Sequence, residues 1–249
     1  MAIHDEAQRG FQAGAAAYER GRPGYPREAI EWLVSLLSLA PERTVLDIGA
    51  GTGKLTRELV ATGAQVVAIE PVLAMREQLE RAVAAARALD GTAEALPVGD
   101  GSVDAITVAQ AFHWFDVTRA LAEFHRVLRP AGRFVLIWNR RNLDQPLHRE
   151  ISAIIEPYHG DTPRHQRGAW RPPLDSSALF TPVAELEVPY GQELDIEGVV
   201  DRVGSTSFIA ALPEPEREDV LGRVRALAAG WPEPLRLGYT TEAYMYERR

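Results

Sequence analysis

The chain of 249 residues contains no cysteine. This absence excludes disulfide bonds, zinc–thiolate sites and cysteine nucleophiles, and it suits a reducing compartment, so we expect a cytoplasmic protein. No apolar run approaches the roughly 20 residues that a membrane-spanning helix needs. The N-terminus lacks a basic region followed by an apolar core, so no secretory signal is predicted. The sequence therefore predicts no membrane partner, and no residue pattern in it indicates a metal site.

An excess of positive charge is also lacking, because the formal net charge is −8 at pH 7. Proteins that bind nucleic acids along a broad surface are usually basic, so no nucleic-acid partner is expected. Hydrophobic residues make up 46% of the chain and charged residues 25%, which is typical of a globular protein. The length allows one sizeable α/β domain or a core domain with a smaller appendage. The oligomeric state stays open.

A glycine-rich turn is the most informative feature that is present. The aliphatic and β-branched segment Thr44–Ile48 predicts a strand, and it runs into the G-x-G-x-G pattern of Gly49–Gly53 before a predicted helix. Bare glycine backbone can lie close to a ligand, and a helix N-terminus offers free N–H groups. A dinucleotide pattern would need a glycine at Lys54, and a P-loop would need one at Ile48. Both phosphate-binding interpretations therefore fail.

Strand and helix patterns alternate along the chain, which predicts parallel βαβ units in an open, doubly wound α/β sheet. The predicted strands are Thr44–Ile48, Gln65–Glu70, Gly91–Ala93, Ser102–Ala109, Arg133–Trp138, Val183–Pro189 and Gly238–Tyr246. The predicted helices lie at about 26–37, 55–60, Leu73–Leu89, Asp116–Leu128, Leu147–Tyr158, Ile196–Val203 and Glu214–Ala229. Pro130–Gly132 is expected to end the helix before it and to form a turn.

Polar side chains follow the predicted strands at the edge where open α/β sheets place ligands. Asp47 ends the first strand and can face an ammonium group, directly or through water. Glu70 ends the second strand, about 20 residues beyond the glycine turn, where it can accept both hydroxyls of a ribose. An ordinary surface glutamate is the alternative for Glu70. Gly91–Pro97 can present backbone groups and the Glu94 carboxylate to an adenine edge, although this segment is a weak signal alone.

The segment Val108–Asp116 follows the fourth strand and contains three aromatic residues and a histidine. Its aromatic rings can form a wall that excludes water, and Gln110 can contact an amino-acid group of the ligand. His113 either orients a substrate or acts as a general base, or it is a packed, hydrogen-bonded histidine. The segment lacks the Asn/Asp-Pro-Pro-Tyr/Phe signature of enzymes that methylate base or amide nitrogens. Methylation of such nitrogens is therefore disfavoured.

Taken in order, these segments resemble the motif series of class I S-adenosylmethionine-dependent methyltransferases. The matching segments are Val45–Lys54, Val66–Pro71, Gly91–Pro97, Asp104–Asp116 and Leu121–Trp138. The flanking Phe11, Ala15, Tyr18 and Arg22–Pro26, together with Ala111–Asp116, are similar to the trans-aconitate-methyltransferase-like group of small-molecule methyltransferases. The fold resemblance covers about residues 28–139 and the last two strands.

The resemblance implies a Rossmann-like, mostly parallel seven-stranded sheet with an antiparallel terminal strand and an inserted substrate cover. Residues 1–27 would form a cap, residues 28–139 the cofactor-binding core, and residues 140–249 the cover with the last two strands. The implied cofactor is S-adenosylmethionine. Its implied contacts are Tyr18, Arg22 and Gln110 at the methionine part, Asp47, Gly49 and Gly51 in the loop, Glu70 at the ribose, and Ala93 and Glu94 at the adenine.

The leading hypothesis is an enzyme that moves a methyl group by in-line displacement to a small-molecule acceptor, such as a carboxylate or a phenol. A quinone- or lipid-precursor C-methyltransferase and a non-catalytic cofactor-binding partner are the alternatives. Trp114, Trp138 and Arg140 are the candidate substrate residues. Arg141, His165, Arg167, Trp170 and Arg171 could also meet an acidic substrate, or they could be solvated loop residues. A nicotinamide enzyme is disfavoured by Lys54.

Overall fold

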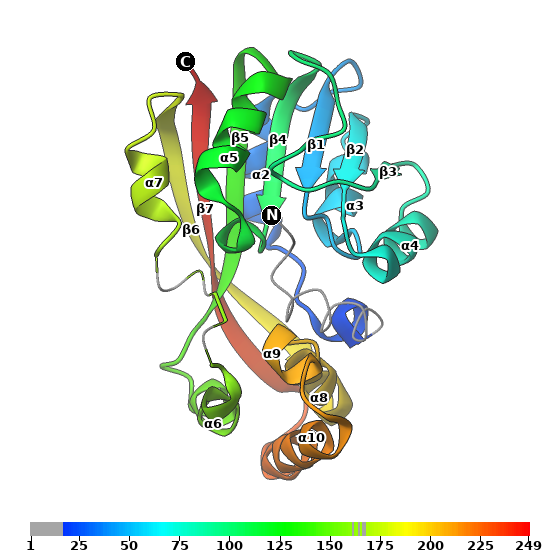
Figure 1. Ribbon diagram of the computed structural model, residues 1–249. Coiled ribbons are helices and arrows are strands. Elements are labelled where there is room, and N and C mark those ends of the chain that lie inside the picture. The colour runs from blue at the N-terminus through cyan, green and yellow to red at the C-terminus, as the bar shows by residue number, and fades with distance from the viewer. Residues whose placement is uncertain (1–16, 161, 164, 166–167) are drawn as a thin grey trace.

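The computed structural model describes residues 17–160, 162–163, 165 and 168–249. Its centre is a seven-stranded sheet with the strand order β3-β2-β1-β4-β5-β7-β6 (Figure 1). The strands are β1 (Thr44–Ile48), β2 (Gln65–Ile69), β3 (Arg87–Leu89), β4 (Val103–Ala109), β5 (Leu128–Arg141), β6 (Phe180–Leu194) and β7 (Leu235–Arg248). The strands β1 to β5 pair in parallel, and β7 is antiparallel to β5 and β6. The predicted α/β sheet with an antiparallel terminal strand is confirmed.

Helices cover both faces of this sheet, as expected for parallel strands joined by helical crossovers. They are α2 (Arg27–Leu37), α3 (Lys54–Val60), α4 (Leu73–Ala82), α5 (Val117–Val127), α6 (Pro146–Ile155), α7 (Arg171–Asp175), α8 (Ile196–Gly204), α9 (Ser207–Ala210) and α10 (Glu214–Ala228). The short 3-10 helices are η1 (Phe112–Trp114) and η2 (Glu156–Tyr158). The carboxylate of Asp116 accepts the backbone N–H of Arg119 and caps α5, as the sequence predicts.

Alternate residues of the central strands feed two hydrophobic clusters on opposite faces of the sheet. Leu46 packs with Phe124 of α5 on one face, whereas Val45 packs with Leu33 of α2 and Leu59 of α3 on the other. All five side chains are fully buried. This double cover leaves the carboxyl ends of the parallel strands as the edge where a ligand site can form.

The long strands β6 and β7 run beyond the rest of the sheet and carry a second group of helices, α6, α8, α9 and α10 (Figure 1). A third hydrophobic cluster holds this group together, with Ile151 of α6, Val199 of α8, Val224 of α10 and Tyr239 of β7 among its members. We call this group, with the adjoining ends of β6 and β7, the cover lobe. Its position gives the site a second wall opposite the sheet edge.

Two predicted boundaries between β2 and β4 were wrong. Helix α4 ends at Ala82, not at Leu89, and the third strand is Arg87–Leu89, not Gly91–Ala93. The alanine-rich stretch favours a helix locally, but Arg87–Leu89 forms a parallel ladder with Val67–Ile69 of β2, and this tertiary pairing prevails. The residues after β3 are thereby freed to form a loop beside the ligand edge.

The predicted turn at Pro130–Gly132 lies inside β5, where Ala131 has a φ of +60° and the register to β4 shifts between Val103 and Ala105. A bulge in a continuous strand therefore replaces the expected turn. The strands β6 and β7 are also longer than predicted, because their outer halves pair with each other from Tyr190 to Leu194 beyond the apolar alternation that marks the inner halves.

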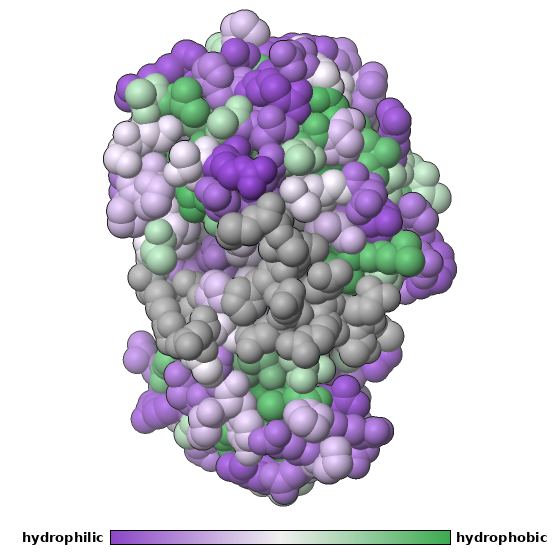
Figure 2. Space-filling view, viewed as in Figure 1, coloured by the Kyte–Doolittle hydropathy of each residue, from purple (hydrophilic) through white to green (hydrophobic). Residues whose placement is uncertain are grey.

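Hydrophilic residues cover much of the upper and lower parts of the face in Figure 2. Among the described residues, the exposed large hydrophobic side chains are Leu73, Leu143 and Val183. Within the same part of the chain, no helix is long and apolar enough to span a membrane.

Candidate cofactor and substrate site

A first cavity, which encloses about 890 Å³ of empty space including its opening, lies at the carboxyl ends of β1, β2 and β4. Parallel strands end at the same edge of the sheet, so residues far apart in sequence meet there. Eight predicted site residues lie in its wall: Tyr18, Gly49, Gly51, Glu70, Ala93, Glu94, Gln110 and Trp114. Seven of these residues are predicted cofactor contacts, and Trp114 is a predicted substrate residue.

The glycine turn between β1 and α3 adopts a backbone that side chains would oppose. Gly49, Gly51 and Gly53 have φ values of +66°, +59° and +88°, which L-residues rarely adopt. A Cβ atom on Gly49 would also lie 2.7 Å from the Cβ atom of Ala111. These glycines thus let the backbone form the floor of the first cavity.

Glu70 is fixed in the cavity wall by two backbone hydrogen bonds. Its side chain accepts the N–H groups of Gly51 and Val72, both at 2.8 Å, and the residue is only 6% exposed. Burial raises its pKa to about 7, although these two hydrogen bonds oppose the shift. Each carboxylate oxygen accepts two hydrogen bonds when fully satisfied, so the bonded Glu70 retains acceptor capacity for a ligand.

Asp47 occupies a different environment from the predicted one. It is fully buried, and its two oxygens accept the hydroxyl groups of Thr56 of α3 at 2.7 Å and Thr107 of β4 at 2.8 Å. Burial raises its pKa to about 6. Asp47 lies in the wall of none of these three cavities, so its predicted contact with an ammonium group, directly or through water, stays a prediction. It braces β1 against α3 and β4 beneath the glycine turn.

The loop after β3 supplies the side of the first cavity opposite the glycine turn. Ala93 is buried in it, and the Glu94 carboxylate accepts the backbone N–H of Asp116 at 2.9 Å. Gly91 allows a close approach here, because a Cβ atom at this position would lie 2.8 Å from Cδ of Pro97. The hydrogen bond from Asp116 ties this loop to the start of α5.

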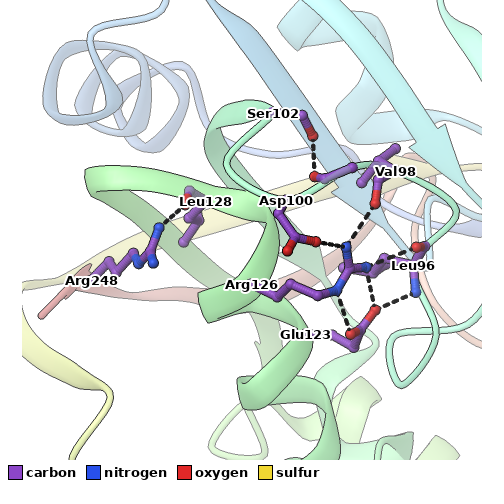
Figure 3. Close-up of polar contacts among 9 residues, drawn as sticks. Leu96, Val98, Asp100, Ser102, Glu123, Arg126, Leu128 and Arg248 are labelled. Carbon is purple, nitrogen blue, oxygen red and sulfur yellow. Dashed lines mark hydrogen bonds and ion pairs between the residues drawn. The ribbon is translucent and has the colours of Figure 1, made fainter.

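Arg126 of α5 clamps the continuation of the same loop (Figure 3). Its guanidinium donates to the carbonyls of Leu96 and Val98 and pairs with Asp100 and Glu123, at 2.7–3.0 Å. Hydrogen bonds from Glu123 and Asp100 raise the pKa of Arg126 further. Arg126 was not predicted, because in sequence an arginine of an amphipathic helix is indistinguishable from a solvated charge.

Residues 17–21 form a helical turn that lies against the glycine turn and α3. Glu19 receives the hydroxyl of Thr52 at 2.6 Å and the guanidinium of Arg57 at 2.9 Å, and its carbonyl receives the ammonium of Lys54 at 2.8 Å. Tyr18 contributes to the first cavity. The described part of the predicted cap is thus anchored to the core. Phe11 and Ala15, which also support the resemblance, lie outside the described residues.

Arg22 follows this turn and points toward α8. Its Nε and Nη2 atoms donate to the hydroxyl and carbonyl of Ser205 at 3.1 and 2.8 Å, and its guanidinium lies 4.9 Å from the Tyr18 ring centroid. Burial, and next the charge of Arg202, lower its pKa to about 10. Arg22 lines a small second cavity together with Gly49 and Lys54. Its contact with the methionine part stays a prediction.

A third cavity, with about 1070 Å³ of empty space, lies between the sheet edge and the cover lobe. The predicted Trp114, Trp138, Arg140 and His113 line it. Gln110, whose φ is +59°, lies in the wall of all three cavities, and Trp114 lies in the walls of the first and third. Tyr18 also lines all three cavities, so the two large cavities adjoin at Tyr18, Gln110 and Trp114.

His113 is a hydrogen-bond acceptor at one ring nitrogen. Nδ1 of His113 lies 3.3 Å from Nε1 of Trp138, which can only donate, so the proton of the neutral ring lies on Nε2. Burial, and next the electrostatic influence of His165 and Arg22, lowers the pKa of His113 to about 3. The lone pair is therefore occupied and weakly basic. This geometry opposes the general-base interpretation and supports a donor that orients a bound molecule.

Arg140 is neutralised within the protein. Its guanidinium pairs with Glu242, which also accepts Nε2 of His165 at 2.8 Å. Burial opposes ionisation of Glu242, but the bonds from His165 and Arg140 hold its pKa below the ordinary value. The His165 ring stacks on Trp138 with 4.1 Å between ring centroids. Arg140 thus lies in the wall of the third cavity as one partner of an ion pair rather than as an uncompensated cation.

The other predicted substrate residues divide between core, surface and cavity. Trp170 is buried and stacks on Trp138, whereas Arg171 pairs with Glu185 at the surface. Arg141 lines the third cavity. Arg167 lies outside the described residues. Arg171 is thus an ion-paired surface residue at the start of α7 and not a residue of the third cavity wall.

Arg202 of α8 was missed, although it lines the second and third cavities and is only 5% exposed. Its Nε donates to the hydroxyl of Tyr239 at 3.0 Å. A signal was present in the sequence, since Val199 and Val203 place apolar side chains beside it on one helical face. An arginine on the apolar face of a helix is unusual, and this position alone could have marked Arg202 as a candidate functional residue.

The sheet order, the glycine turn and the acidic strand end define an α/β protein with a cavity at the carboxyl edge of its parallel strands. A family profile described as "Methyltransferase domain" matches residues 46–136. An uncharacterized methyltransferase of Mycobacterium tuberculosis is 44% identical over 222 residues, which are 89% of this chain and 86% of that protein. An uncharacterized methyltransferase-like protein of Schizosaccharomyces pombe is 31% identical over 244 residues, or 96% of this chain and 95% of that protein.

Solved structures agree with these relatives. A protein of Anaeromyxobacter dehalogenans assigned to the type II methyltransferases is 28% identical, with a TM-score of 0.63, over 92% of this chain and 97% of that chain. The chain belongs to the class I S-adenosylmethionine-dependent methyltransferases and is an enzyme. These relatives do not identify the trans-aconitate-like group, which stays a prediction.

Proposed function

We propose that the enzyme binds S-adenosylmethionine in the first cavity and methylates a small molecule held in the third. The observation that carries this proposal is the junction of the two cavities at Gln110 and Trp114. An in-line displacement needs the acceptor atom next to the methyl group, and positioning of this kind can supply much of the rate acceleration. A solved geranyl diphosphate methyltransferase in complex with this cofactor shares the fold, with a TM-score of 0.53 at 19% identity.

The residues of the first cavity fit this cofactor. The left-handed glycines leave room for a ligand over the backbone, and the Glu70 carboxylate is oriented to accept ribose hydroxyls. Ala93 and Glu94 would contact the adenine, and Tyr18 and Arg22 the methionine part. When bound, S-adenosylmethionine supplies an electrophilic methyl group on a sulfonium sulfur.

The residues of the third cavity would hold and orient the acceptor. The rings of Trp114 and Trp138 exclude water from the junction, which favours a reaction that neutralises charge. Nε2 of His113 would donate a hydrogen bond to the acceptor. Because the Nδ1 lone pair of His113 already accepts from Trp138, an acceptor that reacts without a base, such as a carboxylate, fits this wall better than a phenol.

We also infer three units from the resemblance: the cap of residues 1–27, the core of residues 28–139, and the remainder as substrate cover with the last two strands. The described cap residues contact both the core and the cover lobe, which supports a role in closing the site. A cytoplasmic location and the lack of a nucleic-acid partner stay predictions from composition. The enzyme assignment replaces the alternative of a non-catalytic cofactor-binding partner.

A quinone- or lipid-precursor C-methyltransferase is the second candidate. A demethylmenaquinone methyltransferase of Thermus thermophilus is 43% identical over 108 residues, which are 41% of this chain and 49% of that protein. More than half of each chain is unmatched, so this likeness supports a common cofactor more strongly than a common acceptor.

Incubation of the purified enzyme with S-adenosylmethionine and panels of carboxylic acids, phenols and quinols tests the proposal, with S-adenosylhomocysteine formation as the readout. We expect acceptor-dependent formation with at least one acid and no formation with the matched amides. Turnover restricted to quinols would contradict the leading proposal and favour the second candidate.

A further inference from the structure

Two arginines face the same space between the cap and the cover lobe. Arg22 from the cap and Arg202 from α8 both line the second and third cavities. Their hydrogen-bond partners are neutral: the hydroxyl and carbonyl of Ser205 for Arg22, and the hydroxyl of Tyr239 for Arg202. Within the described ranges, no carboxylate pairs with either guanidinium.

This pairing pattern differs from that of the neighbouring arginine in the third cavity. Arg140 there is compensated by Glu242, whereas Nη1 of Arg202 is buried and has no hydrogen-bond partner among the described residues. An uncompensated buried charge is costly unless something pairs with it. The cost points to a ligand that supplies the missing negative charge.

The two cations are held together by the backbone. Gly21 packs directly on α8, because a Cβ atom on Gly21 would lie 2.3 Å from the backbone nitrogen of Arg202. On either side of this contact, Arg20 pairs with Asp201 at 2.6 Å and Arg22 bonds to Ser205. The positive charge of Arg202 contributes to the lowered pKa of Arg22. Close packing therefore keeps two like charges near each other, an arrangement that an anion would stabilise.

We propose that Arg202, beside Arg22, anchors an oxyanion of the methyl acceptor, and that the acceptor is a small molecule bearing a carboxylate or phosphate group; Arg22 remains the proposed contact for the methionine part of the cofactor. The assignment rests on the proposed function. Arg202 lies on the cover lobe and outside the wall of the first cavity, where the nucleoside of the cofactor would bind. The oxyanion would anchor the acceptor at the cover side and direct its other end toward Trp114.

Calorimetry with stand-in anions tests this site. The enzyme is first saturated with S-adenosylhomocysteine and then titrated with glutarate, phenyl phosphate and the neutral glutaramide. We expect an anion to bind and glutaramide not to bind, and the tighter of the two anions identifies the preferred oxyanion. Arg202→Met should weaken anion binding about tenfold or more, as for a lost charge-assisted hydrogen bond, and Arg202→Lys should weaken it less.

The matched control is Arg223→Met, which removes an exposed arginine of α10 in the same lobe. It should leave the affinity for the anions unchanged. The melting temperature of each variant checks that it is folded. Unchanged anion affinity in folded Arg202→Met enzyme, or no binding of either anion to the saturated wild-type enzyme, would overturn the proposal.

The cofactor has a carboxylate of its own, and a second comparison separates the two sources. Methylthioadenosine lacks the amino-acid part that S-adenosylhomocysteine carries. If Arg202 bound the carboxylate of the cofactor, Arg202→Met would weaken the binding of S-adenosylhomocysteine but leave the binding of methylthioadenosine unchanged, and the proposal would fail. Unchanged affinity for both nucleosides together with lost anion binding supports it. Failure of the folded wild-type enzyme to bind S-adenosylhomocysteine would instead contradict the proposed function.

Discussion

Two buried carboxylates at adjacent strand ends show how much a single residue's neighbours decide. Both carboxylate oxygens of Asp47 accept hydrogen bonds from buried threonine hydroxyls. Glu70 instead accepts two backbone N–H groups in the wall of the first cavity. From sequence, both were strand-end acids beside a glycine turn. Only Glu70 keeps a position from which it can meet a ligand, because Thr56 and Thr107 enclose Asp47.

Replacement of Glu70 by alanine should weaken S-adenosylhomocysteine binding about tenfold or more, because charge-assisted hydrogen bonds to the ribose would be lost. Calorimetric titration measures this change. Glu77→Ala, which removes an exposed carboxylate of α4, is the matched control and should have no effect. Equal affinities of the Glu70→Ala and wild-type enzymes would remove the ribose assignment.

The raised pKa of Glu70, about 7, predicts a pH dependence of cofactor affinity. Ribose hydroxyls donate to the ionised carboxylate, so binding favours that form and lowers its pKa. Affinity for S-adenosylhomocysteine should therefore fall as pH decreases from about 7 toward 5. Glu70→Gln cannot ionise and should show a flatter profile. Parallel profiles for the two proteins would contradict the role of Glu70.

His113 should stay neutral throughout the physiological range, since burial and nearby positive charge lower its pKa to about 3. Its ring should carry the proton on Nε2, because Nδ1 faces the Trp138 N–H. Nitrogen-15 NMR of the imidazole groups, assigned with a His113→Asn variant, reports both the tautomer and the titration. A titration midpoint near 6.5, the value of a free histidine, would restore the general-base interpretation.

At the scale of elements, strands that consist of strong apolar runs were predictable from sequence. Strands that form only because they pair with another strand were not. The patterns of β1, β2 and β4 mark buried parallel strands on their own. Strand β3 exists because Arg87–Leu89 pairs with β2, and the outer halves of β6 and β7 exist because they pair with each other. Glu70 and Gln110, which directly follow the well-marked strands β2 and β4, accordingly line the first cavity as the sequence suggests. Arg126 and Arg202 lie on helices whose position depends on the tertiary fold, and they were not predicted.

The contact between the cap and α8 gives an element-scale prediction. Gly21→Ala should lower the melting temperature and weaken S-adenosylhomocysteine binding, because the new Cβ would overlap the backbone of Arg202 and displace the cap. Overpacking of this kind costs about 1–3 kcal/mol. Differential scanning calorimetry and isothermal titration measure the two effects.

Gly222→Ala on α10 is the matched control, because, apart from its own stretch of helix backbone, no atom of the described residues lies within 4 Å of its Cβ position. Alanine is favoured over glycine within a helix by roughly 0.5–1 kcal/mol, so this variant should be at least as stable as the wild-type protein. Equal stability and binding of the Gly21→Ala and Gly222→Ala proteins would show that the cap does not need its close approach to α8.

At the scale of the whole molecule, an acidic chain encloses a basic cavity. The net charge is −8, yet Arg22, Arg140, Arg141 and Arg202 line the third cavity, and Glu156 is the acidic residue in its described wall. Composition alone could not predict this separation, since it arises when the cover lobe closes over the sheet edge. The cap joins the two parts, because Glu19 bonds to the core and Arg22 to the cover lobe.

The central claim is that the first cavity is built for the sulfur nucleoside of a methyl donor. The most direct test is side-by-side calorimetric titration of the wild-type enzyme with S-adenosylmethionine, S-adenosylhomocysteine and NAD. The geometry of the glycine turn and Glu70 predicts that both sulfur nucleosides bind and that NAD does not. Binding of NAD, or a folded protein that binds neither sulfur nucleoside, would contradict the claim.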